Sequence, residues 1–215
     1  MRFPARRAAR GRAAALAQYR RRAAHYDAEL AVFEPLRAEA VALLAMHQGQ
    51  RVLDVGCGTG LSFALLEREL GQTGAIVGIE QSPEMLLLAR ERVQAHGWRN
   101  VTLVGAPAEE AQVQGMSDAA LFHFTHDVLR EPRALDNALR HLRPGARVVA
   151  VGLQWAPSWA WPANCFVALA ALYSVSAFDG LARPWDLLAR RLQQFELRTT
   201  ALGGIYLASG VVGPR

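Results

Sequence analysis

The stretch VLDVGCGTG, residues 52–60, holds the residues with the clearest chemical potential. The carboxylate of Asp54 precedes three glycines at alternate positions, Gly56, Gly58 and Gly60. Glycines at this spacing after an apolar strand allow the backbone to approach a ligand closely. The spacing GxGxG does not meet the dinucleotide fingerprint GxGxxG, and a phosphate-binding P-loop needs a lysine, which this chain lacks.

A second carboxylate, Glu80, follows the next predicted strand. Ligands of open α/β sheets bind at the carboxyl ends of the strands, so both acids are expected at one site. The negative charge of Asp54 would repel a pyrophosphate but would attract an ammonium group. The carboxylate of Glu80 can accept hydrogen bonds from the two hydroxyls of a ribose. A strand-to-helix turn without ligand would explain the glycines alone, but not both acids. The pattern predicts a cationic ligand with a ribose and no phosphate.

Apolar periodicity, N-caps and turn residues predict strands and helices that alternate along the chain. Predicted strands cover residues 51–55, 75–79, 101–104, 119–124 and 147–152, and predicted helices cover residues 27–46 (broken, or two short ones), 61–70, 82–96 and 132–142. This alternation predicts an α/β fold with a doubly wound, mostly parallel sheet. Strands beginning at Phe195 and Gly204 are too close for a crossover helix, so we expect an antiparallel hairpin that completes the sheet.

The charge of the chain is concentrated at its start. The formal net charge is +5, yet residues 1–22 contain eight arginines and no acid, and the remainder has more acidic than basic residues. We therefore expect no nucleic-acid partner. The absence of a long apolar stretch or a secretory h-region predicts a cytoplasmic protein, and the two cysteines, Cys57 and Cys165, are expected to be reduced.

The 215 residues allow one substantial core with appendages. We expect a basic tail over residues 1–22, partly disordered or helical, and a helical cap over 23–50. A cofactor-binding core over 51–152 follows, then an aromatic-rich acceptor insert over 153–194 and the hairpin over 195–215.

VLDVGCGTG, IVGIEQS (76–82), LRPGARVVAVG (142–152) and the terminal hairpin together resemble the class I S-adenosyl-L-methionine-dependent methyltransferases. The resemblance implies a Rossmann-like sheet of seven strands and S-adenosylmethionine as cofactor. It also implies that Asp54, Gly56, Gly58 and Gly60 hold the methionine part, that Glu80 binds the ribose, and that Gln81 and Met85 flank the adenine. Further cofactor-binding candidates are Cys57, Ala106, Pro107, Phe124 and Thr125.

The family usually has an Asp after the third strand that binds the adenine amino group. This chain has Gly105, Ala106 and Pro107 there. Either Glu109 substitutes for the missing side chain, or backbone groups and packing alone hold the adenine.

The sequence FHFTHDVLREP, residues 122–132, follows the fourth predicted strand. It lacks the Asn/Asp-Pro-Pro-aromatic motif of nucleobase methyltransferases and the paired acids of arginine methyltransferases, which favours a small-molecule or lipid acceptor. His126 and Asp127 are the catalytic candidates, with His126 as a general base for an acceptor that must lose a proton. Alternatively, His126 is a loop residue and Asp127 caps the next turn. The chain has no other cluster at ligand spacing, so we expect no metal.

Aromatic residues fill the predicted insert, and a group of seven rings favours an acceptor wall over an ordinary core or a dimer surface. The substrate candidates are Trp155, Trp159, Tyr173 and, near the start, Tyr26. RRRAAHYDAELAVFEPLR, residues 20–37, resembles the start of quinone-biosynthesis and phospholipid methyltransferases, which implies that Tyr26 and Asp27 cover the cofactor.

The predicted function is methyl transfer from S-adenosylmethionine to a small, partly apolar acceptor by in-line displacement, with positioning dominant. One alternative is a membrane-associated lipid or quinone methyltransferase whose arginine-rich tail makes weak contact with the membrane surface. Another is a non-catalytic cofactor-binding or interaction protein on the same fold. A monomer or a homodimer is expected.

Overall fold

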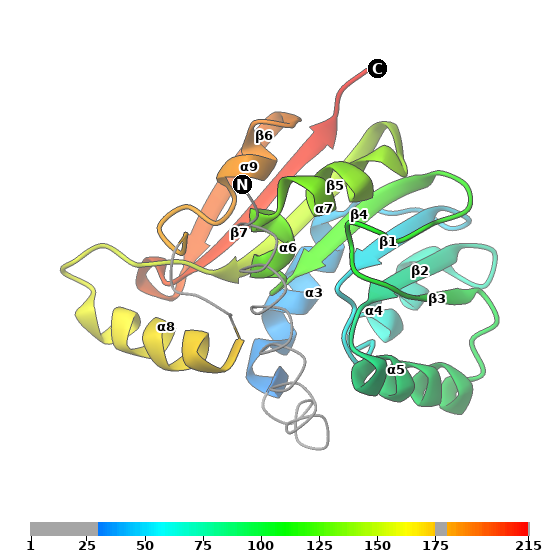
Figure 1. Ribbon diagram of the computed structural model, residues 1–215, viewed down its shortest axis with the longest axis horizontal. Coiled ribbons are helices and arrows are strands. Elements are labelled where there is room, and N and C mark those ends of the chain that lie inside the picture. Colours follow the sequence, from blue (N-terminus) through cyan, green and yellow to red (C-terminus); the bar gives the residue numbers. More distant parts are fainter. Residues whose placement is uncertain (1–29, 175–179, 215) are drawn as a thin grey trace, which may run out of the picture.

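A seven-stranded sheet organises the described residues, 30–174 and 180–214, of this computed structural model (Figure 1). The strands are β1 Arg51–Val55, β2 Ala75–Glu80, β3 Val101–Gly105, β4 Ser117–His123, β5 Leu142–Leu153, β6 Leu192–Thr200 and β7 Ile205–Val212. Their order is β3-β2-β1-β4-β5-β7-β6, and β7 runs antiparallel to both of its neighbours. The predicted mostly parallel sheet with an antiparallel hairpin is confirmed.

The strand order reverses beside β1. From β1 the chain moves outward to β2 and β3, then returns to place β4 and β5 on the other side of β1. Asp54 lies opposite Gly78 of β2 and Leu121 of β4. A sheet of this kind binds ligands at such a reversal, outside the carboxyl ends of the strands.

Helices cover both faces of the sheet. They are η1 Ala31–Phe33, α3 Glu34–Leu43, α4 Phe63–Leu70, α5 Pro83–His96, α6 His126–Arg130, α7 Pro132–Arg140, α8 Trp161–Ser174, α9 Asp186–Ala189 and η2 Ala201–Gly203. The helices α3 and α4 pack on one apolar layer, and α6, α7 and α9 pack on the other. Ser82 caps α5 as predicted, because its hydroxyl accepts the Met85 N–H at 3.3 Å.

Several predicted boundaries were wrong. The strand β4 ends at His123, and His126 opens α6 with Thr125 as the N-cap residue, so Asp127 is not the cap. The strand β5 begins at Leu142, because the turn at residues 144–145 bends the chain without ending its pairing with β4. The insert contains the unpredicted helices α8 and α9, and β6 begins at Leu192. Tyr26 and the tail, residues 1–22, lie outside the described residues.

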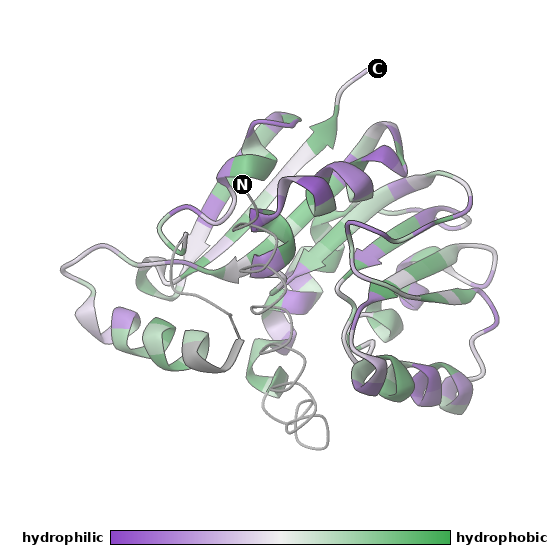
Figure 2. Cartoon of the chain, viewed as in Figure 1, coloured by the Kyte–Doolittle hydropathy of each residue, from purple (hydrophilic) through white to green (hydrophobic). Residues whose placement is uncertain are grey.

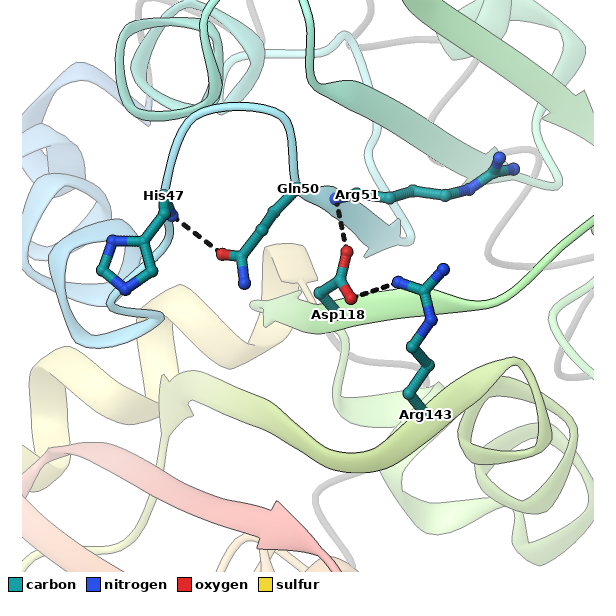
Figure 3. A network of polar contacts seen from close by, with 5 residues as sticks. All are labelled: His47, Gln50, Arg51, Asp118 and Arg143. Carbon is teal, nitrogen blue, oxygen red and sulfur yellow. Dashed lines mark hydrogen bonds and ion pairs between the residues drawn. The ribbon is translucent and has the colours of Figure 1, made fainter.

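A polar network ties the amino ends of β1, β4 and β5 together (Figure 3). The Arg51 N–H donates to Oδ2 of Asp118 at 2.8 Å, and the Arg143 guanidinium pairs with the same carboxylate. Nearby, the His47 N–H donates to Oε1 of Gln50 at 2.8 Å. This network lies at the amino edge of the sheet, away from the carboxyl ends where a ligand is expected.

Candidate functional site

The glycine loop folds back over the end of β2. The backbone N–H groups of Gly56 and Cys57 both donate to the Ile79 carbonyl, at 2.8 and 3.0 Å. The φ angles of Gly56, Gly58 and Gly60 are 71°, 57° and 78°. A Cβ at Gly56 would lie 2.4 Å from Cγ2 of Thr125. The close approach of β1 and β4 at this point therefore requires a glycine.

Asp54 places a buried carboxylate at the candidate site. Its side chain is 1% exposed, and its Oδ2 has no hydrogen-bond partner among the described residues. Burial raises the pKa of Asp54 to about 7, the Arg37 charge opposes this rise, and the Glu80 charge adds to it. A buried ionised carboxylate without a partner is costly, so a ligand ammonium group at this place would fit the side chain.

Glu80 connects the glycine loop to the start of α5. Its Oε2 accepts the Gly58 N–H at 3.1 Å, and its Oε1 accepts the Ser82 N–H at 2.7 Å. Burial raises the pKa of Glu80, and the N–H groups of Ser82 and Gly58 oppose this rise. Since each carboxylate oxygen has a second lone pair, Glu80 keeps acceptor capacity for a pair of ribose hydroxyls.

The ends of β2 and β3 meet beside Glu80. The Ala106 N–H donates to the Glu80 carbonyl at 3.1 Å, and Met85 is buried at the start of α5. The Pro107 carbonyl accepts the N–H groups of residues 110 and 111, both at 2.9 Å. Thus the residues expected around the adenine (Gln81, Met85, Ala106 and Pro107) follow two neighbouring strands. The role of Glu109 in adenine binding stays a prediction.

Arg37 is a site residue that the sequence reasoning missed. It is 1% exposed on α3 and pairs with Glu34, and its Nε has no partner among the described residues. Its positive charge acts to lower the pKa of both Asp54 and His123. The apolar face of α3 with its flanking residues comprises Phe33, Ala40, Val41 and Leu44. The sequence did contain a signal for its burial, because Arg37 falls at helical spacing among these apolar residues. That signal was hard to recognise in a chain with so many arginines.

His126 lies between the end of β4 and β5. Its Nε2 accepts the Leu153 N–H at 2.8 Å and lies 3.0 Å from the Leu153 carbonyl oxygen. Burial lowers the pKa of His126, while Leu153 and the Asp127 charge act to raise it. Its Nδ1 is buried without a partner among the described residues.

The described residues contain no cluster of three or more His, Cys, Asp or Glu side chains that would hold a metal.

A row of three aromatic rings begins at the end of β4. The ring centroids of Phe33 and Phe124 are 4.7 Å apart, and those of Phe33 and Phe166 are 6.3 Å apart. Phe124 has a φ of 57°, a left-handed conformation that costs a side-chain-bearing residue roughly 1–2 kcal/mol. Such strain at a strand end is typical of functional sites. The row links β4, η1 and α8.

The other rings of the insert do not join this row. Trp155 packs against the apolar layer of α3 and α4, whereas Trp159 is 71% exposed. Trp185 lies at a separate place, where its ring centroid is 5.9 Å from that of Phe195. Tyr173 belongs to α8, but its side chain lies outside the described part of the chain. The predicted single aromatic wall is therefore divided among several places.

Comparison with known proteins relates this site to one family. Residues 52–145 match a family described as a methyltransferase domain. An arsenite methyltransferase of Halobacterium salinarum is 32% identical over 112 residues, which are 50% of this chain and 28% of that protein. A demethylmenaquinone methyltransferase of Listeria welshimeri is 30% identical over 117 residues, 54% of this chain and 50% of that protein. The chain thus spans half or less of the length of these two relatives.

Solved structures share the fold. A Haloferax volcanii methyltransferase, determined in complex with its Trm112 activator, aligns with a TM-score of 0.69 at 14% identity. The alignment covers 90% of this chain and 96% of that protein. At such identity the likeness establishes the architecture alone.

Proposed function

We propose that this chain, whose residues 52–145 match a methyltransferase domain, is a class I S-adenosylmethionine-dependent methyltransferase that transfers a methyl group to a small, partly apolar acceptor. The observation that carries the proposal is the buried Asp54 carboxylate, whose Oδ2 has no partner among the described residues. S-Adenosylmethionine has an ammonium group, a sulfonium and a ribose diol, and it has no phosphate. Asp54 and the glycine loop would hold its methionine part, and Glu80 would hold the ribose hydroxyls.

The bound cofactor supplies a methyl group on a positively charged sulfur, which an acceptor atom displaces in line. The protein therefore contributes mainly by positioning the two reactants and excluding water. Phe124 and Phe33 form an apolar surface at the end of β4, next to the glycine loop. This surface supports an acceptor with an apolar part.

The proposed role of His126 depends on the acceptor. A base is needed only if the acceptor must lose its proton, as a phenol or a carbon acid does. A base would have to use Nδ1, which has a free lone pair only in the tautomer whose Nε2–H donates to the Leu153 carbonyl at 3.0 Å. The neighbouring Asp127 acts to raise the pKa of His126 and so would favour proton uptake. Positioning remains the main contribution in this proposal.

A lipid or quinone acceptor is a second candidate. The relative named demethylmenaquinone methyltransferase supports it, as does the aromatic row that leads from β4 toward α8. A non-catalytic cofactor-binding role would be distinguished by cofactor binding without methyl transfer.

Calorimetric titration tests the cofactor site. Wild-type protein should bind S-adenosylmethionine and not NAD. Asp54→Asn should weaken that binding by about tenfold or more, because a charge-assisted hydrogen bond is lost. Asp118→Asn, a matched change at the amino edge of the sheet, should bind as wild type does. Equal binding by Asp54→Asn would contradict the proposed site.

Methyl transfer needs a separate test. The full chain is incubated with S-adenosylmethionine labelled on the methyl group and with phenols, amines and a quinol as acceptors. Label should move to an acceptor with an apolar part. Cofactor binding without transfer to any of them would favour the non-catalytic role.

A further inference from the structure

Exposed apolar side chains gather around α8. Among the described residues, the exposed large apolar side chains outside α5 are Val32, Trp159, Trp161, Phe166, Leu169 and Leu202. Three of them belong to α8, and Trp159 lies two residues before its start. Val32 lies in η1 next to Phe33, whose ring contacts Phe166, and Leu202 lies in η2, which contacts α8. Leu87 on α5 is exposed by itself, as single apolar residues on protein surfaces commonly are.

The exposed residues of α8 form one face of the helix. They are Trp161, Pro162, Cys165, Phe166 and Leu169, a spacing that repeats every helical turn. The opposite face holds the fully buried Val167 and Ala171, which pack in the core. The helix is therefore attached to the protein on one side, while the outer face presents no charged side chain. We call these five residues, with Trp159, the α8 face.

The segment around α8 contains no titratable charge. Residues 148–178 include no Asp, Glu, Lys, Arg or His, and the described part of α8 is predominantly hydrophobic (Figure 2). A helix that is apolar on all sides is normally buried in a core or in a membrane. With 14 residues, α8 is too short to span a bilayer, and no other described helix has the length and hydropathy to do so. The outer face of α8 is thus apolar surface that the described residues leave exposed to water.

We propose that the α8 face inserts into the headgroup region of an anionic lipid bilayer. The side chains suit this place, because tryptophans accumulate at membrane interfaces and Leu169 and Phe166 supply apolar area. Trp159, Trp161 and Leu169 are 71%, 68% and 60% exposed. Their insertion would therefore remove a large apolar area from water.

The arginine-rich segment supports a lipid surface over other occupants. Residues 1–22 carry eight arginines and no acid, which complements anionic phosphate groups. The chain between Arg22 and Ala31 is at most about 30 Å long when fully extended, so the last arginines of the segment, Arg20 to Arg22, can reach a surface that the α8 face touches. A second copy docked on the same face would bring two such segments together. Repulsion between them disfavours a dimer through this face.

The aromatic row connects the α8 face with the candidate site. Phe166 belongs to the face, and Phe33 lies between it and Phe124 at the end of β4. An acceptor arriving from the membrane would meet apolar surface along this path. This step rests on the proposed methyl transfer, whereas membrane binding by the α8 face does not.

Vesicle sedimentation tests the proposal on the full chain. The vesicles contain phosphatidylcholine alone, or phosphatidylcholine with one third phosphatidylglycerol. Wild type should bind the anionic vesicles, and Trp161→Gln/Leu169→Gln should weaken the partitioning by about tenfold or more. The matched control Leu87→Gln should bind as wild type does. Removal of residues 1–22 should weaken binding to the anionic vesicles alone. Brominated lipid should quench tryptophan fluorescence, and less so in Trp161→Phe.

Three outcomes would overturn the proposal. The first is wild type that binds neither vesicle. The second is a pair of results: the double variant binds as wild type does, and the protein without residues 1–22 does not bind. Together they would assign the contact to the arginines alone. The third is a dimer that the double variant converts to a monomer, without vesicle binding, which would make a second copy the occupant. Retained melting temperature and S-adenosylmethionine binding in the double variant separate these failures from misfolding and from failure of the proposed function.

Discussion

The backbone N–H of Gly58 donates to Oε2 of Glu80 over 3.1 Å, which joins the middle of the glycine loop to the end of β2. The other oxygen of Glu80 accepts the Ser82 N–H, at the N-cap of α5. One carboxylate thus holds three segments in register. The shape of the loop depends on this side chain, and the proposed recognition of a ribose would depend on it too.

Glu80→Gln should therefore lower the stability that the glycine loop gives the fold, and it should also weaken cofactor binding. The glutamine amide has one acceptor oxygen, so its NH₂ group must face the N–H of either Gly58 or Ser82. We expect about 1–3 kcal/mol lower stability to urea, and weaker calorimetric binding of S-adenosylmethionine. Glu110→Gln, at an exposed position, is the control and should leave both quantities unchanged. Wild-type affinity in Glu80→Gln would remove Glu80 from the ribose site.

Gly56→Ala should destabilise the protein for two separable reasons. The positive φ strains any side-chain-bearing residue, and the new Cβ would lie 2.4 Å from Cγ2 of Thr125. Gly145→Ala is the control for strain alone, because φ is 82° and no atom of the described residues lies within 4 Å of its Cβ position. Thermal melts should show the larger loss for Gly56→Ala. Addition of Thr125→Ser, which removes Cγ2, should recover part of it.

His126→Ala should lower stability, because the Leu153 N–H would lose its buried acceptor. The expected loss is about 1–3 kcal/mol in urea denaturation, whereas His47→Ala at an exposed position should change little. A role as base makes a further prediction. Since burial lowers the pKa of His126, the rate with a proton-losing acceptor should rise with pH below neutrality. A pH profile that is unchanged in His126→Gln would leave only the structural role.

The sequence predicted the sheet well where local signals were strong. Apolar runs such as Arg51–Val55 are bounded by glycines and have few alternative structures. Asp54 and Glu80 were identifiable because they lie at or next to the carboxyl ends of neighbouring parallel strands. The helix α8 was missed, since its apolar residues surround the whole helix and show no period of 3.6.

Local sequence patterns could not predict the contacts between segments that are distant in the chain. The partner of His126 is the backbone of Leu153, and the two meet only because β4 pairs with β5. Arg37 acts on Asp54 only after α3 has packed against the sheet. The division of the insert's tryptophans between exposed and packed positions likewise depends on where α8 and α9 dock.

Asp54 lowers the stability of the protein in the pH range where its carboxylate is ionised and would bind a cation best. Its pKa is about 7 in the folded chain, against an ordinary value of 3.8, so the folded state holds an extra proton between these pH values. Stability therefore falls as pH rises through this window, since the unfolded state binds fewer protons. The shift corresponds to a free-energy difference on the order of 4 kcal/mol above pH 7.

Asp54→Asn should thus raise the free energy of unfolding at pH 8, while the difference from wild type should shrink toward pH 4, which lies close to the pKa of the unfolded carboxyl. Denaturation in urea at pH 4, 6 and 8 measures this. In wild type, an ammonium ligand favours the ionised carboxylate, so binding between pH 5.5 and 7 should release a proton and strengthen with pH. Titrations in buffers of different ionisation enthalpy measure the proton. Asp118→Asn should reproduce neither effect, and an affinity of wild type that is constant from pH 5.5 to 7 would show that Asp54 does not face the ligand ammonium.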